Sequence, residues 1–135
     1  MSNQEKKGVR LSITDEDIRT IIMQDEPKLL VEQAKEIGQA LSRTLTKSQI
    51  RHIFGTVRQI KMNWTGEAQR AASYRQLLLL KPKLQYQAAR TKGVKPLADM
   101  LDKAIDYVED DQVRFGRFVD FFEAILAYHT AAGGK

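Results

Sequence analysis

The amino-acid sequence predicts an all-α protein that folds as a single compact helical bundle of about five to six helices. After residue 13, apolar residues recur every three or four positions in nearly every segment, which is the spacing of one helix face. Several of these segments begin with residues typical of helix N-termini. The 135 residues are close to the usual size of one domain. We expect a flexible N-terminal arm at 1–12, a helical bundle domain at 13–131 and a flexible tail at 132–135.

The first three helices have the clearest start signals. A threonine followed by three acidic residues predicts an N-cap and a short helix over 14–23. A proline in the first turn predicts a second helix over 27–43. Thr46 and Gln49 have the spacing of a capping box, so a third helix should cover 46–63.

Three further helices are expected in the second half of the chain. A fourth helix follows Gly66 and reaches a loop at 91–95. Pro82 lies inside it and cannot donate a backbone hydrogen bond, so we expect the helix to kink or restart there. Pro96 begins a fifth helix, and a final helix with regularly spaced phenylalanines covers 111–131.

The charge is distributed unevenly along the chain. The net charge of the whole sequence is +5, but residues 43–95 contain twelve basic residues and a single acid, Glu67. The flanking segments 1–42 and 96–135 are both acidic. A basic surface attracts polyanions and steers their approach, so this distribution predicts a polyanionic partner.

The sequence contains few residues that could form an active site. It contains no cysteine, and His52 and His129 do not share a metal-ligand spacing. No phosphate-loop glycine pattern occurs. We therefore expect no enzyme activity, no metal and no cofactor. The acidic residues near the fifth helix have the spacing of a solvated polar face; they are Asp99, Asp102, Asp106, Glu109, Asp110 and Asp111.

No membrane association is expected. The apolar runs are far shorter than the ~20 residues of a membrane span. The first ten residues are polar and lack the apolar core of a signal peptide. No basic helix combines its charge with a large apolar face for the membrane surface. We expect a cytoplasmic protein.

The hypothesis that the protein binds a polyanion rests on one stripe of basic residues on the third helix. On the third helix, Lys47, Arg51, Arg58 and Lys61 follow one another at separations of 4, 7 and 3, which places them on one side of the helix. An ordinary solvated helix face is the alternative interpretation. The near-absence of acidic residues over 43–95 favours a track for the phosphates of a polyanion.

Aromatic residues offer a second possible contact. Trp64, Tyr74 and Tyr86 alternate with the basic residues, and single-stranded nucleic acids are held by phosphate contacts together with stacking on aromatic rings. Packing in the core is the alternative for each of them.

Three segments have recognisable sequences: residues 46–51 are T-K-S-Q-I-R, residues 79–90 are L-L-K-P-K-L-Q-Y-Q-A-A-R, and residues 118–129 are F-V-D-F-F-E-A-I-L-A-Y-H. In this order they resemble the T-x-S-Q-I-R helix start and the L-L-K-P-K-L-x-Y-x-A-x-R and F-x-x-F-x-E-A-I-x-A-Y-H segments of the small-subunit family of the type III-A CRISPR effector, the Csm complex. The resemblance implies a non-catalytic helical protein of antiviral defence that stacks in several copies along the complex. Its partners would be guide RNA, target RNA, other Csm subunits and further copies of itself.

The resemblance also implies RNA-backbone contacts at Lys47, Arg51, Lys81, Lys83 and Arg90. The spacing of basic residues extends this set to Arg58, Lys61 and Arg75. Two alternatives stay open: a free-standing helical regulator that binds nucleic acid, and a protein-interaction bundle whose basic face meets an acidic partner.

Overall fold

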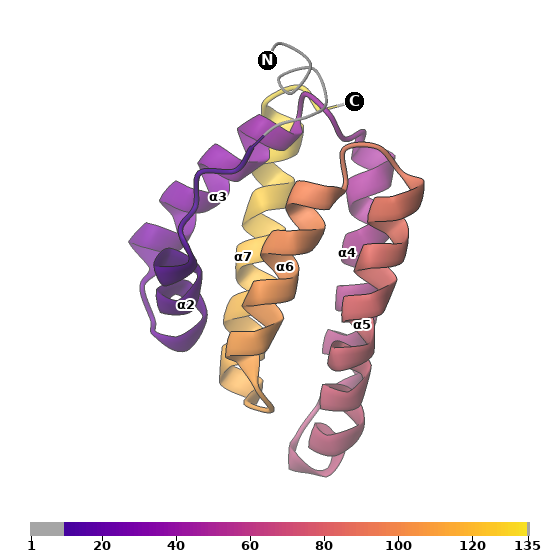
Figure 1. Ribbon diagram of the computed structural model, residues 1–135. Helices are drawn as coiled ribbons and strands as arrows, with labels where there is room; N and C mark the ends of the chain where they lie inside the picture. The colour runs from indigo at the N-terminus through magenta and orange to yellow at the C-terminus, as the bar shows by residue number, and fades with distance from the viewer. Residues whose placement is uncertain (1–9, 135) are drawn as a thin grey trace.

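A computed structural model describes residues 10–134, which form six α-helices and one 3-10 turn (Figure 1). The elements are α2 (Asp15–Met23), α3 (Pro27–Leu41), α4 (Lys47–Asn63), the 3-10 turn (Glu67–Gln69), α5 (Arg70–Arg90), α6 (Lys95–Val108) and α7 (Gln112–Ala131). No strand occurs in this part of the chain, so the prediction of an all-α bundle is confirmed. Within the same residues, no helix combines the length and the apolar character needed to cross a membrane.

The predicted helix starts are confirmed by their capping hydrogen bonds. The Thr14 hydroxyl accepts from the backbone N–H of Asp17 at 3.0 Å and caps α2. At the start of α4, the Thr46 hydroxyl accepts from the Gln49 N–H at 3.1 Å. The Gln49 side chain accepts from the Thr46 N–H at 2.8 Å, which completes the capping box. Asp111 caps α7 through its carboxylate.

The helix α5 does not restart at Pro82. It runs as one helix from Arg70 to Arg90, although the proline removes one backbone hydrogen bond. Pro82 itself is exposed, whereas Leu80 and Leu84 on either side of it are buried. Because these two leucines are anchored in the core, packing maintains a helix that local propensity disfavours.

The helices form three layers. The pair α6 and α7 lies in the centre, with α2 and α3 against one side and α4 and α5 against the other (Figure 1). Among the described helices, α3 and α7 contact each other most extensively. These two helices meet closely at Gly38, where a Cβ would lie 2.7 Å from the carbonyl oxygen of Ile125.

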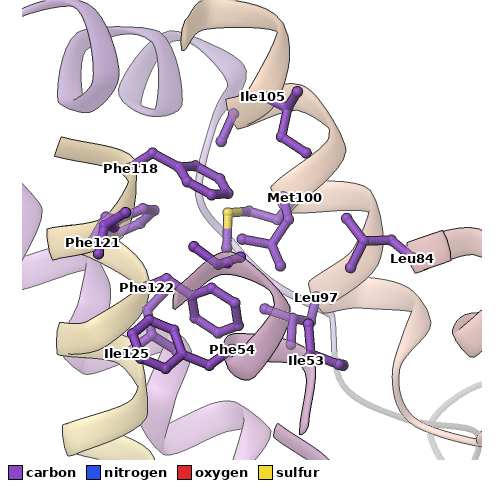
Figure 2. Packing of buried hydrophobic residues seen from close by; sticks show 14 of the residues in the cluster. Ile53, Phe54, Leu84, Leu97, Met100, Ile105, Phe118, Phe121, Phe122 and Ile125 are labelled. Carbon is purple, nitrogen blue, oxygen red and sulfur yellow. The ribbon is translucent and has the colours of Figure 1, made fainter. Parts of the chain in front are cut away.

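Phenylalanines of α7 fill the centre of the core (Figure 2). Phe118, Phe121 and Phe122 are completely buried, and Phe118 and Phe122 lie toward residues of α4 and α6. Phe54 of α4 meets Phe122 edge-to-face with ring centroids 5.1 Å apart. Each such ring contributes roughly 1.5–3 kcal/mol through its burial. The last helix therefore holds the outer helix pairs together.

The predicted arm and tail lie partly outside the described residues, which exclude 1–9 and 135. Of the segment 10–14, Leu11 and Ile13 are half-buried against the core. After α7, the N–H of Gly134 donates to the carbonyl oxygen of His129 at 2.9 Å. The flexibility of the two ends stays a prediction.

Candidate nucleic-acid interface

Four cations follow one edge of α4 and are called the α4 ridge: Lys47, Arg51, Arg58 and Lys61. Lys47 is half-buried, and the other three side chains are exposed. The helix contains no acidic residue, and none of the four forms a salt bridge among the described residues. The ridge therefore offers positive charge that its own chain does not neutralise.

The ridge faces away from α5. Gln49 and His52 of α4 line a groove together with Gln87 and Thr91, so this side of α4 faces α5; we call it the α4–α5 groove. Successive residues of an α-helix are rotated by about 100°. The ridge consequently lies on the other side of the buried stripe that contains Val57.

A second group of cations lies on the solvent side of α5. We call this surface the α5 outer face and define it by five exposed residues: Arg75, Leu79, Lys83, Tyr86 and Arg90. Their positions are out of phase with the buried stripe of α5. The three cations among them form no salt bridge in the described part of the chain. The two basic surfaces are therefore separated by the α4–α5 groove.

Lys81 belongs to neither surface. Its Nζ donates to the carboxylate of Asp106 and lies 3.7 Å from Oδ1 of Asp102. The hydrogen bond to Asp106 raises the pKa of Lys81 most, and both carboxylates add a coulombic contribution. An RNA phosphate would have to compete with two acids for this lysine, so the structure separates Lys81 from the other seven candidate residues.

The acids of α6 bind cations of the same chain instead of forming only a solvated face. Lys95 lies 3.2 Å from Asp99, within the helix. Arg70 of α5 reaches across to Asp110, with 3.3 Å between the two charged groups. Asp110 lies just after α6, so the ion pairs that join α5 to α6 itself are those of Lys81, and sequence analysis missed them. The spacing of the acids could have indicated them, because Asp102 and Asp106 lie one turn apart on the same side of α6.

The three aromatic candidates have different environments. Trp64 is only 3 % exposed and stacks on Phe115 with ring centroids 5.2 Å apart. Tyr74 is half-buried against the core. Tyr86 is 58 % exposed. Core packing therefore accounts for Trp64, whereas the ring of Tyr86 is open to a ligand.

The histidines do not form a metal centre. His52 is exposed beside the α4–α5 groove, and His129 is buried with its Nε2 2.7 Å from the carbonyl oxygen of Leu45. Over residues 10–134, no three or more His, Cys, Asp or Glu side chains come together in a way that could hold a metal ion.

Comparison with known proteins identifies one family. A family model described as Csm2 Type III-A matches residues 24–135. This match includes α3 to α7, and with them both the α4 ridge and the α5 outer face. No curated protein matches the chain, and no solved structure matches it.

Proposed function

The chain belongs to the Csm2 Type III-A family of small subunits of the Csm complex, and from this premise we propose that it contacts guide and target RNA through the α4 ridge without cleaving them. In this role it is a scaffold protein of antiviral defence in the cytoplasm. It would lie beside other Csm subunits and stack with further copies of itself along the complex.

The observation that carries the proposal is the row of unneutralised cations on α4. From Lys47 to Lys61 the ridge extends over about 21 Å at 1.5 Å per residue, which is long enough for several phosphates. Lys and Arg side chains bound to phosphates fix the position of a nucleic acid without reading its bases. Such contacts suit a subunit that must accept any guide sequence.

The two alternatives make different use of the same surface. A free-standing regulator of the helix-turn-helix type normally presents a recognition helix whose polar side chains read base edges, whereas the exposed edge of α4 is rich in Lys and Arg, which suit phosphates. An acidic protein partner would be attracted by the same charges. Direct measurement of RNA binding separates the acidic partner from the proposed function.

The first prediction tests the ridge. We expect Arg51→Ala, Arg58→Ala and Lys61→Ala, combined in one variant, to weaken the binding of single-stranded RNA by at least about tenfold in low salt, because three phosphate contacts are lost. Thermal stability should hardly change, since exposed substitutions usually cost less than ~0.5 kcal/mol each. Fluorescence anisotropy with labelled RNA and circular dichroism measure the two quantities.

The matched control removes the same charge from other surfaces. Lys28 and Lys35 of α3 and Lys103 of α6 are exposed and form no salt bridge in the described residues, so we use their triple alanine variant. This variant has the same net charge as the ridge variant. Equal loss of RNA affinity in both would mean that net charge alone attracts RNA, and unchanged affinity of the folded ridge variant would place the contact elsewhere.

A further inference from the structure

Tyr86 is the one aromatic side chain of residues 10–134 that is exposed. Burying an aromatic ring is among the largest single gains available to a folding chain, and this ring does not make that contribution. It lies on the α5 outer face, whose residues include three unneutralised cations. An exposed ring among cations has the composition of sites that hold single-stranded nucleic acids.

Arg90 holds the ring in place. One turn further along α5, its Nη1 donates to the Tyr86 hydroxyl at 2.8 Å. Its guanidinium carbon lies 5.5 Å from the centroid of the Tyr86 ring, which is within the range of a cation–π contact. The pair presents two flat groups, and nucleobases stack on both aromatic rings and guanidinium planes.

The surroundings of the pair favour an RNA strand over a protein. The whole of α5 lacks acidic residues, and Lys83 and Arg75, about one turn and three turns before Tyr86 on the same helix, are free to meet phosphates on its N-terminal side. Exposed apolar area on α5 is limited to a few side chains, with Leu79 45 % exposed.

We propose that Tyr86 and Arg90 form a stacking site for an unpaired base of single-stranded RNA, with Lys83 contacting a neighbouring phosphate and Arg75 a phosphate further along the strand. The proposal rests on the proposed function, because it takes RNA as the ligand. It adds a second contact that is separated from the α4 ridge by the α4–α5 groove. It also specifies the ligand as an unstacked base, because the bases of a duplex are not accessible to a ring on a helix surface.

The experiment compares two probes that differ only in their bases. One is a short oligoadenosine RNA, and the other is an abasic oligonucleotide of the same length. The full chain and its variants are titrated with each probe, with anisotropy as the signal. The parent chain should bind the probe with bases more tightly. Tyr86→Leu should weaken its binding of that probe by roughly five- to tenfold, while the affinity for the abasic probe stays the same.

Tyr86→Phe is the matched control, because it keeps the ring and loses only the hydroxyl. Its affinity should stay close to that of the parent. The dependence of affinity on salt should be the same for the parent and both variants, because no phosphate contact is removed. As a measurement independent of any variant, photocrosslinking of a 4-thiouridine RNA to the parent chain should label the segment around Tyr86.

Three outcomes would overturn the stacking site alone. The first is that the parent binds both probes with equal affinity. The second is that Tyr86→Leu and the parent bind the oligoadenosine with equal affinity. The third is that Tyr86→Leu loses self-association without any change in RNA binding. The last outcome would assign the α5 outer face to a protein contact. Absence of any RNA binding by the parent would contradict the proposed function and the stacking site together.

Discussion

Gly38 lies on α3 at the point where this helix meets α7. A Cβ there would lie 2.7 Å from both the Ile125 carbonyl oxygen and the Tyr128 Cβ, and 2.8 Å from the His129 nitrogen. Two of these three atoms belong to the backbone and cannot rotate away. Gly55 on α4 provides a contrast, because nothing lies within 4 Å of a Cβ built there.

We therefore predict opposite effects of the same substitution. Gly38→Ala should destabilise the protein by about 1–2 kcal/mol, since overpacking outweighs the better helix propensity of alanine. Gly55→Ala should stabilise it by about 0.5–1 kcal/mol. Urea unfolding of both variants measures the two values, and a stabilised Gly38→Ala variant would show that α3 and α7 can separate at no cost.

Whether an aromatic side chain is buried or exposed can be predicted from its position relative to the buried stripe of its helix. Trp64 follows Ile60 by four positions and so continues the buried stripe of α4. Tyr86 comes two positions after Leu84 and is out of phase with the buried stripe of α5. The stacking of Trp64 on Phe115 cannot be predicted from the sequence, because that contact depends on how α4 packs against α7.

At the scale of whole elements, charged contacts link α5 to α6. Lys81 is 28 % exposed and lies between the carboxylates of Asp102 and Asp106. Its hydrogen bond to Asp106 raises its pKa in the folded protein above the usual lysine value. A raised pKa means that the folded state holds this proton more tightly than the unfolded chain does. The resulting stabilisation is complete below about pH 10.5 and is lost as the pH rises through the higher folded pKa.

We expect Lys81→Met to lower the free energy of unfolding by about 0.5–1 kcal/mol near neutral pH. The difference from the parent should shrink as the pH rises above about 10.5 and through the raised folded pKa, because the parent then loses the same proton. Lys83→Met is the control; Lys83 lies two residues away and forms no salt bridge in the described chain, so its stability should equal that of the parent throughout. A difference for Lys81→Met that does not vary with pH would indicate lost packing and not lost charge.

Most of the elements could be predicted from local signals. Apolar spacing and capping residues located all six helices within a few residues, because these signals act within one or two turns. The continuity of α5 through Pro82 could not be predicted in this way, since it depends on Leu80 and Leu84 being buried against other helices. The spacing of Asp102 and Asp106 indicates two acids on one side of α6, but that Lys81 is their partner depends on how α5 packs against α6.

At the scale of the whole molecule, the proposed RNA contact predicts how the affinity for RNA depends on the salt concentration. If the four cations of the α4 ridge each neutralise one phosphate of a single strand, the logarithm of the affinity should fall with the logarithm of the salt concentration with a slope on the order of −3. The slope should become shallower by about 2 in the ridge variant, because three phosphate contacts are lost. Anisotropy titrations over a range of salt concentrations measure it, and a flat response would exclude a phosphate track.

The sequence identified the cations but not their grouping. Seven of the eight candidate residues are divided between the α4 ridge and the α5 outer face, and the eighth, Lys81, is paired with acids. This division depends on which sides of α4 and α5 face each other across the groove. The packing of the two helices determines which sides face each other, and the spacing of residues within one helix does not.

The three-layer arrangement also has a kinetic consequence. The basic helices α4 and α5 lie on one side of the central pair, and the acid-rich helix α2 lies on the other together with α3, whose charges balance (Figure 1). The molecule is therefore an electric dipole as well as a cation. In the field of an approaching RNA it experiences a torque that turns the basic side forward before contact, so more encounters begin in a productive orientation. Added salt screens this field. It should therefore slow the association of this protein with RNA more than it slows the association of a uniformly charged protein of the same net charge.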